Sequence, residues 1–300
     1  NVLEALQFVK KCFKKDPEYG LMMSAKLGCL NSLNFFKSIG ARKIDVAMKK
    51  AAHYGHIEIL RQCKDWGANK FVRAMAQAAR FGHIDIVKLF KGWGADCFRM
   101  TWEEAAYHGH YDIVKLLLEW DGSFVGGGME RAAAGGHIRI VRLCKANGAR
   151  SYSRTILSAA EHGHVDIIKL SEGVKNVNII TNAVQLATMN GHIEVIKLLM
   201  EWGVPCCWIA WFNASYYGHF DIVKLLLEWD GSYINDSIRY AAEGGHTDIV
   251  RLLKENGATN FISVVITAAE NGHIAIIKLF KEWNVIDDMH VVLFSASRMS

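Results

Sequence analysis

The stretch Ala78-Ala79-Arg80-Phe81-Gly82-His83-Ile84-Asp85-Ile86-Val87-Lys88-Leu89-Phe90 decides the fold, because close copies of it recur along the chain. A fixed period of this size is the signature of a solenoid, in which small structural units stack in a row. The Gly-His pair of the stretch returns in steps of 27 residues, with one step of 28, at Gly55-His56, Gly82-His83, Gly109-His110, Gly136-His137, Gly163-His164, Gly191-His192, Gly218-His219, Gly245-His246 and Gly272-His273.

Each repeat predicts two helices separated by the Gly-His turn. Glycine takes the left-handed conformation that ends many helices, so Gly82 is expected to end the first one. Neither helix can bury its apolar face alone, so neighbouring repeats must stack. Helical spacing places two apolar faces on either side of Gly82: Phe71, Ala74, Met75, Ala78 and Ala79 before it, and Ile84, Ile86, Val87, Leu89 and Phe90 after it.

The repeated pattern Ala-Ala-x-x-Gly-His-x-(Asp/Glu)-(Ile/Val)-(Val/Ile)-x-Leu-(Leu/Phe) resembles the helix-turn-helix core of the ankyrin-repeat family over nearly all of the chain. The family's period is about 33 residues, so the segment that normally forms its β-hairpin fingers is missing here. The resemblance therefore implies an all-α, ankyrin-like αα-solenoid of 27-residue repeats with the hairpins reduced or absent. The short, Trp-Gly-rich repeats also resemble ankyrin-like proteins that large cytoplasmic DNA viruses encode in multiple copies.

We expect residues 1–300 to form a single array of about nine clear repeats with degenerate repeats at both ends. In the repeat register the chain starts at a second helix and stops at a first helix. We therefore expect it to be a fragment of a longer array. The pattern weakens after Gly163, which predicts a local irregularity near residues 171–180.

The composition of the chain limits the classes of function that it can have. The net charge of +5 is modest and does not by itself indicate nucleic-acid binding. Seven cysteines without a C-x-x-C pair predict reduced thiols and a cytoplasmic location, with Cys63 and Cys144 at core positions. No apolar run approaches the roughly 18 residues of a membrane span. Catalytic, cofactor-binding and metal-binding motifs are also missing, so we expect no enzyme, no cofactor and no small-molecule ligand.

Three repeated residue types are candidate binding sites. The turn histidines could bind a metal, but their spacing favours a structural bond between repeats. Six repeated tryptophans could form an exposed ladder, although packing against the next repeat is favoured: Trp66, Trp93, Trp120, Trp202, Trp229 and Trp283. A basic row on the second helices could follow a phosphate backbone, but acids three residues earlier in seven repeats are expected to pair with it: Arg61, Lys88, Lys115, Arg142, Lys169, Lys197, Lys224, Arg251 and Lys278.

The variable surface of the first helices is the predicted binding site. Residues ten, six and two positions before each turn glycine share one helix face, which we call the stripe. In most repeats the stripe is mixed or charged, but in one it is Trp208, Phe212 and Tyr216. Three exposed aromatics fit an interface anchor, unless another part of the array covers them. The full predicted partner-binding set is Trp208, Phe212, Tyr216, Met189, Ile262 and Ile266.

These observations favour a scaffold that binds a partner protein on its concave face, such as a viral adaptor that engages host factors. A structural component that associates end to end is the alternative, and a nucleic-acid-binding repeat protein is a weaker one.

Overall fold

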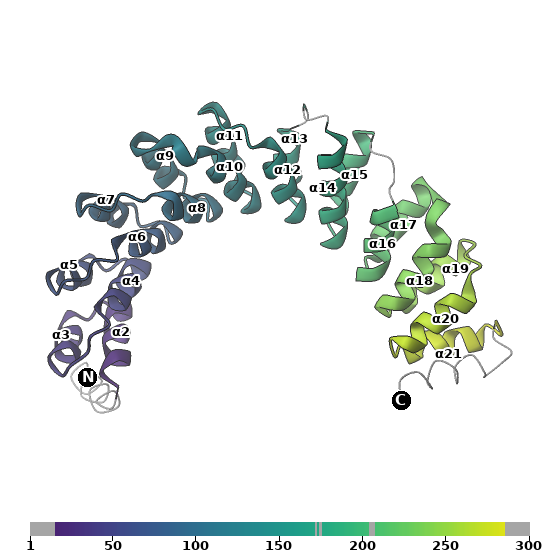
Figure 1. Ribbon diagram of the computed structural model, residues 1–300, viewed down its shortest axis with the longest axis horizontal. Helices are drawn as coiled ribbons and strands as arrows, with labels where there is room; N and C mark the ends of the chain where they lie inside the picture. Colours follow the sequence, from purple (N-terminus) through teal and green to yellow (C-terminus); the bar gives the residue numbers. More distant parts are fainter. Residues whose placement is uncertain (1–15, 172, 174–175, 204–207, 286–300) are drawn as a thin grey trace. The chain divides into compact units, whose positions relative to one another are not determined.

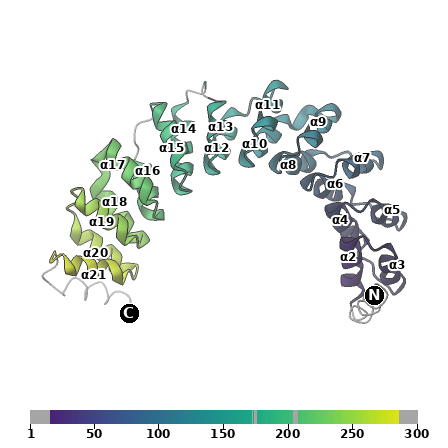
Figure 2. The same cartoon turned by 180° about the vertical axis from the view of Figure 1, so that it is seen from behind.

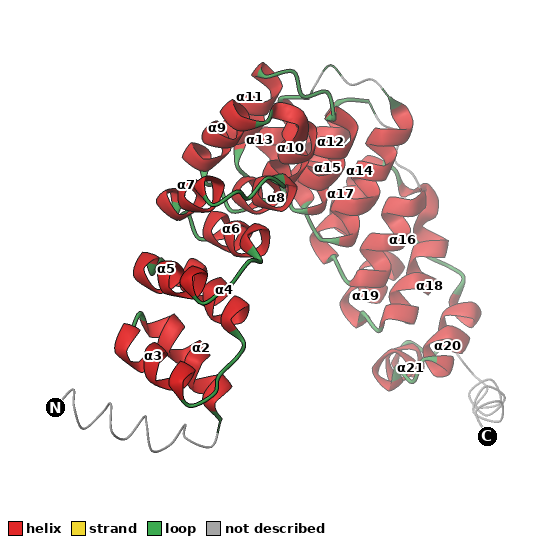
Figure 3. Ribbon diagram, turned by 60° about the vertical axis from the view of Figure 1, so that its left-hand side comes forward, coloured by secondary structure: helices red, strands yellow, loops and turns green. Residues whose placement is uncertain are grey.

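The computed structural model describes residues 16–171, 173, 176–203 and 208–285, which form helices joined by short loops, with no strand among them (Figure 3). The predicted all-α, ankyrin-like solenoid without hairpin fingers is therefore confirmed. The chain divides into two compact units, one up to Thr155 and one from Ile156, and the boundary falls inside a helix. The single continuous array over residues 1–300 therefore stays a prediction.

In unit 1 the helices alternate between two rows (Figure 1). The first helices of the repeats are α2 (Pro17–Leu27), α4 (Ile44–Tyr54), α6 (Phe71–Arg80), α8 (Arg99–Tyr107) and α10 (Val125–Ala134). The second helices are α3 (Leu30–Ser38), α5 (Ile57–Asp65), α7 (Ile84–Gly92), α9 (Tyr111–Trp120) and α11 (Ile138–Ala146), and a short 3₁₀ helix, η1 (Gly122–Phe124), precedes α10.

Unit 2 repeats the arrangement, and Figure 2 shows its two rows from behind. Its first helices are α12 (Tyr152–Glu161), which contains the unit boundary, α14 (Val177–Met189), α16 (Trp208–Tyr217), α18 (Ile234–Gly244) and α20 (Phe261–Glu270). Its second helices are α13 (Val165–Lys169), α15 (Ile193–Glu201), α17 (Phe220–Trp229), α19 (Thr247–Glu255) and α21 (Ile274–Glu282), with the 3₁₀ helix η2 (Gly231–Tyr233) before α18.

Small residues let the first helices pack closely. Ala78 and Ala79 are fully buried in α6, and consecutive first helices contact each other more extensively than consecutive second helices do. On the second helix α7, the side chains of Ile86, Val87 and Phe90 are buried, as the periodicity predicts. The core of each unit thus lies between the two rows, and the far side of the first helices stays accessible.

The turn histidines connect consecutive repeats by hydrogen bonds. At eight of these turns the imidazole Nε2 donates to a backbone carbonyl at the end of the preceding first helix, as in His110 to Arg80 O at 2.8 Å. The same bond, at 2.8–3.0 Å, is made by His56, His83, His110, His137, His192, His219, His246 and His273. The structural role predicted for these residues is confirmed, although the bond reaches the preceding repeat and not the next one.

The turn glycines are required for two reasons. Gly82 has a φ of 79°, which only glycine adopts without strain. A Cβ atom there would also lie 2.8 Å from the ring of His110 of the next repeat. The glycine therefore ends its helix and makes room for the histidine that docks on that helix.

Several sequence features lie outside the described residues. Residues 1–15 and 286–300 are among them, with the degenerate repeat expected at the C-terminal end, and so is part of the segment near 171–180. The degenerate repeat expected near the N-terminal end is described, as α2 and α3. On either side of that segment, α13 is only five residues long and α14 is thirteen. The cysteines described as free thiols are Cys29, Cys63, Cys97 and Cys144; burial raises the pKa of both Cys63 and Cys144 to about 12.

Replacing Gly82 by Ala tests the docking of the histidine. We expect Gly82→Ala to destabilise unit 1 by about 1–2 kcal/mol for the left-handed backbone. We expect a further loss, about 1 kcal/mol, because the ring of His110 must shift from its hydrogen bond. Gly67→Ala is the control, since Gly67 also has a positive φ but has open space around it. Equal shifts of the urea denaturation midpoint in the two variants would show that the histidine contact is unimportant.

Candidate functional site

The first position of the stripe has a structural role in several repeats. Asp45 Oδ1 accepts the backbone N–H groups of Asn69 and Lys70, each at 3.1 Å, just before the next first helix begins. Glu18 and Asn235 hold the following repeat in the same way. In these repeats the first stripe position is not a free surface, because its side chain satisfies the otherwise unpaired donors at a helix N-terminus.

The last stripe position of the same repeat is also occupied internally. The His53 ring stacks on Tyr54 at 4.1 Å and on Phe81 at 3.7 Å between centroids. Burial, followed by the nearby charges of Lys50 and Arg80, lowers the pKa of His53. This part of the stripe is therefore a neutral aromatic stack and not a charged face.

In unit 2 the predicted anchor residues form an aromatic cluster, which we define as Trp208, Phe212, Tyr216 and Tyr240. Ring centroids along α16 are 6.3 Å apart for Trp208–Phe212 and 5.6 Å apart for Phe212–Tyr216. Tyr240, on the neighbouring α18, meets Phe212 edge to face at 4.6 Å. The sequence interpretation missed Tyr240, whose signal was its place on the adjacent first helix, five residues before its own turn glycine.

The exposure of the cluster is uneven. Trp208 is 55% exposed, whereas Phe212 and Tyr216 are half-buried. Trp211, three residues further along α16 and about 60° around the helix, is 1% exposed, because it lies on the buried face together with Ala210 and Ala214. Trp208 thus lies at the outer edge of the cluster. Its ring contacts Phe212, which in turn contacts Tyr216.

The other predicted contact residues are more distant from the cluster. Met189 is half-buried at the end of α14, beside α16, and its carbonyl accepts the bond from His219. Ile262 is 71% exposed and Ile266 is half-buried, both on α20. Because α18 packs against both α16 and α20, it separates these isoleucines from Trp208.

Two self-capping loops explain why Trp208 is available. The repeat that follows it enters its first helix through Asp230-Gly231-Ser232, where the Asp230 carboxylate accepts both the backbone N–H and the hydroxyl of Ser232. Those bonds lower the pKa of Asp230. The equivalent loop of unit 1 is capped by Asp121, which accepts the Ser123 N–H at 2.9 Å. Since the loop caps itself, no carboxylate is needed at the first stripe position of the preceding repeat.

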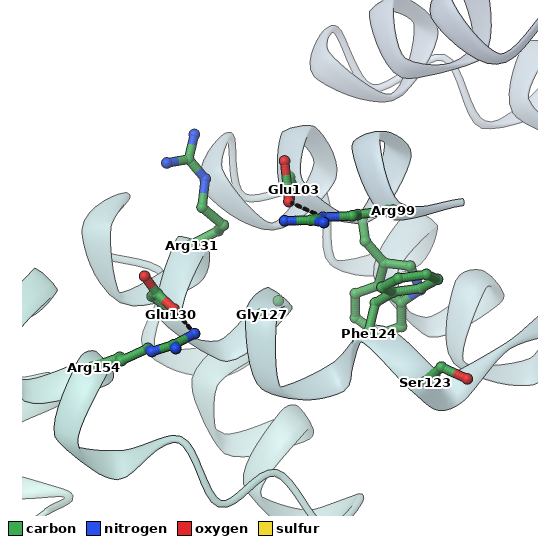
Figure 4. A pocket seen from close by; sticks show the side chains of 10 residues that line it. Arg99, Glu103, Ser123, Phe124, Gly127, Glu130, Arg131 and Arg154 are labelled. Atoms are coloured by element: carbon green, nitrogen blue, oxygen red, sulfur yellow. Dashed lines mark hydrogen bonds and ion pairs between the residues drawn. The ribbon is translucent and has the colours of Figure 1, made fainter. Parts of the chain in front are cut away.

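In unit 1 the same kind of loop borders a cavity of about 350 Å³. Its charged lining comes from the first helices α8, α10 and α12 (Figure 4). Arg99 Nε lies 3.0 Å from Glu103 Oε1, and an Arg154 guanidinium nitrogen lies 3.7 Å from Glu130 Oε2. The full lining is Arg99, Trp102, Glu103, Ser123, Phe124, Gly127, Gly128, Glu130, Arg131 and Arg154.

Three consecutive glycines start the helix beside this cavity, and two of them have a packing reason. A Cβ at Gly126 would lie 2.7 Å from Ser151 Oγ, and one at Gly128 would lie 2.7 Å from the buried ring of Trp102. A Cβ at Gly127 would meet nothing within 4 Å, and its backbone is helical. Gly127 therefore weakens α10 without any packing requirement, and its missing side chain leaves the cavity open (Figure 4).

The cavity and the aromatic cluster occupy corresponding positions of a duplicated block. The segment from Gly109 to Gly122 returns at Gly218 to Gly231, an offset of 218 − 109 = 109 residues, with only Tyr111 changed, to Phe220. With this offset Arg99, Glu103 and Tyr107 correspond to Trp208, Phe212 and Tyr216, and Arg131 corresponds to Tyr240. The same position is thus charged in unit 1 and aromatic in unit 2.

The two copies also differ beneath the surface. The indole N–H of Trp102 donates to Asp121 O at 3.2 Å. The indole N–H of Trp211, its counterpart, has no partner among the described residues. The side chains of Asn213, Ser215 and Ser237 likewise hold buried polar atoms without a partner in this part of the chain. Below the cavity, Thr101 Oγ1 is one such atom among the described residues, so the core below the aromatic cluster holds more of them.

The other repeated residues have mixed outcomes. Five of the six tryptophans are half-buried as predicted, but Trp229 is 47% exposed. Lysines of the preceding second helix cover several of them, as Lys64 covers Trp93 at 4.7 Å. The expected pairing of the basic row with acids three residues earlier forms, across the described helices, only at Glu194–Lys197, at 2.7 Å. Long side chains on exposed helix faces gain little by pairing, so they remain solvated.

Two features of the described residues bear on metal binding and on membrane insertion. They hold no group of three or more His, Cys, Asp or Glu side chains placed to bind a metal ion. None of the helices described is both long enough and apolar enough to cross a membrane.

Comparison with known proteins agrees with the class that the fold defines, a protein of stacked two-helix repeats. Residues 211–287 match the family model described as ankyrin repeats, in three copies. This segment contains most of α16, together with α17 to α21. No curated protein matches the sequence. Ankyrin repeats generally mediate protein–protein interaction.

Adjacent glycines of α10 give a test of the open cavity. Gly127→Ala should stabilise unit 1 by about 1 kcal/mol, because alanine is the better helix former and its methyl group meets open space. Gly128→Ala should destabilise it by roughly 1–3 kcal/mol, because the methyl group overpacks against Trp102. Thermal denaturation of the two variants measures both effects. A loss of stability in Gly127→Ala would mean that this glycine has a structural role.

Proposed function

We propose that this protein is a non-enzymatic scaffold that binds a partner protein on the exposed face of its first helices. The observation that carries this proposal is the aromatic cluster of unit 2. Its outermost residue, Trp208, exposes more than half of its surface although the core of the repeat lies directly beneath it. An exposed tryptophan supported by other aromatic rings is the usual anchor of a protein interface.

The cluster is pre-organised for contact. Phe212 is held between the rings of Tyr216 and Tyr240, so it is already ordered before a partner arrives. Aromatic side chains bury large areas and lose little conformational freedom on binding. Arg239 covers the Tyr240 ring at 4.4 Å and adds a charged edge to the patch.

Local charge favours a protein over a nucleic acid at this cluster. Although bases stack on aromatic side chains, such sites need a basic groove for the phosphates. The charged residues on α18 beside the cluster are Asp236, Arg239 and Glu243, which together carry a charge of −1 (one positive and two negative). A phosphate backbone would be repelled there.

The proposed surface extends along the row of first helices. Met189 on α14 and Ile262 and Ile266 on α20 offer further apolar contacts on either side of the cluster. An adaptor of this kind, acting in the cytoplasm on host-cell factors, follows from the resemblance to multicopy viral repeat proteins.

Two tryptophans three residues apart test the proposal. Trp208→Ala should weaken partner binding by up to about 2 kcal/mol or more and change the denaturation midpoint little, because Trp208 is exposed. Trp211→Ala should instead cost about 3–5 kcal/mol of stability as a deletion of a buried ring. If both variants unfold the chain equally, the cluster is part of the core and the proposal is wrong.

The partner can be identified by site-specific crosslinking in the intact chain. A photoreactive amino acid at position 208 should crosslink one protein that the same group at position 224, on the exposed face of α17, does not. The crosslink should disappear when Phe212 is also replaced by Ala. The same set of proteins crosslinked from both positions would contradict a binding site on the first helices.

A further inference from the structure

We propose that the cavity of unit 1 binds a carboxylate group presented by an acidic peptide segment of a partner protein. The cavity lies at the position that corresponds to the aromatic cluster, but it belongs to the other unit and has a different chemistry. The proposal does not depend on the cluster. It rests on the net charge of the cavity lining, on the missing side chain at Gly127 and on the apolar ring of Phe124.

The charges that line the cavity leave one cation unbalanced. Arg99 and Arg154 are paired with Glu103 and Glu130, at 3.0 and 3.7 Å. Arg131 has no carboxylate within 4.0 Å among the described residues. Three arginines and two glutamates sum to +1, which a single carboxylate neutralises. Arginine binds carboxylates through paired, charge-assisted hydrogen bonds.

Arg131 is oriented for this task. Its guanidinium carbon lies 4.8 Å from the centre of the Tyr107 ring, so one face of the group rests on an aromatic surface. A guanidinium that stacks by its face keeps its N–H edge available for a planar acceptor. Figure 4 shows its side chain extending apart from the two ion pairs.

The floor of the cavity is made by Gly127. The eight other clear repeats carry a side chain at this position, nine residues before the turn glycine: Val46, Arg73, Met100, Arg154, Asn182, Ile209, Asp236 and Ser263. A bare backbone in the first turn of α10 lets a ligand approach the end of the helix, whose partial positive charge favours an anion. The missing side chain at Gly127 and the arginines around it therefore both favour the binding of one anionic group.

The walls favour a peptide rather than a free ion. Phe124 lines the cavity and is half-buried above the fully buried Trp102, so an apolar neighbour of the carboxylate would be accommodated beside the Phe124 ring. A volume of about 350 Å³ lies within the usual range for ligand pockets. The expected ligand is thus an acidic residue next to an apolar one.

A nucleic acid fits this cavity less well. A strand carries regularly spaced phosphates and needs a row of unpaired cations. Here Glu103 and Glu130 lie within the cavity lining, and Glu104 follows on α8. These carboxylates would repel the phosphates on either side of the one bound by Arg131.

Two fluorescein-labelled peptide mixtures test the proposal on the full chain. They are identical except for a central residue, Glu in one and Gln in the other, and the flanking positions are random apolar residues. Fluorescence anisotropy at low ionic strength, where charges are least screened, measures binding. The Glu mixture should bind at least about tenfold more tightly than the Gln mixture, as expected for a charge-assisted pair.

Three variants complete the experiment. Arg131→Gln should abolish the preference for Glu, and Gly127→Leu should do so by filling the cavity while α10 stays helical in circular dichroism. Lys115→Gln, which removes an exposed charge from α9 of the same unit, should leave the preference unchanged. Labelled oligothymidine is the competing probe.

The proposal is overturned if the two mixtures bind equally or if Gly127→Leu binds like the unchanged chain. It is also overturned if Lys115→Gln weakens binding as much as Arg131→Gln, since the effect would then be unspecific attraction. Oligothymidine that binds more tightly than the Glu mixture, and loses binding in Arg131→Gln, would assign the cavity to nucleic acid instead.

Discussion

The hydrogen bond from a turn histidine to the preceding first helix, which eight repeats make, is the interaction on which the stacking of these repeats depends. It links residues of consecutive repeats that are about 30 positions apart in the chain. It also satisfies a carbonyl at a helix end, where no partner exists within the helix. The glycine at that helix end must have no side chain, because the imidazole of the next repeat lies against it. The Gly-His pair is thus one device shared between two repeats, and its conservation along the chain follows from both halves of the contact.

A second contact between repeats decides which surface positions are free for binding. Glu18, Asp45 and Asn235 use the first stripe position to cap the next first helix. Where the connecting loop carries Asp-Gly-Ser, the loop caps itself, and the stripe position is released. Arg99 and Trp208 are the two residues that occupy this position before such loops. The variable surface of the molecule therefore depends on the chemistry of a loop that lies one repeat further on.

The duplicated block shows how one scaffold supports two kinds of surface. In unit 1 the position has arginines, glutamates and a bare glycine around a cavity. In unit 2 it has four aromatic rings, three of which contact the ring of Phe212. The buried tryptophan beneath is retained in both, as Trp102 and Trp211. Because the core is set by the repeat and the outer face is not, the outer face can change without altering the fold.

The sequence by itself determined the period, the two helices of each repeat, the glycines that end them and the apolar faces that are buried. These features depend on local spacing and on backbone conformation, both of which can be read along the chain. It also placed Trp208 outside and Trp211 inside, since Trp211 shares the apolar face of the helix with Ala210 and Ala214 and Trp208 falls outside that face. Only the tertiary structure decided that Asp45 is a cap, that Tyr240 completes the aromatic cluster and that Gly127 opens a cavity. Each of these depends on which residues of a neighbouring repeat come within a few ångströms, and that distance is set by the packing of helices and not by position within one repeat.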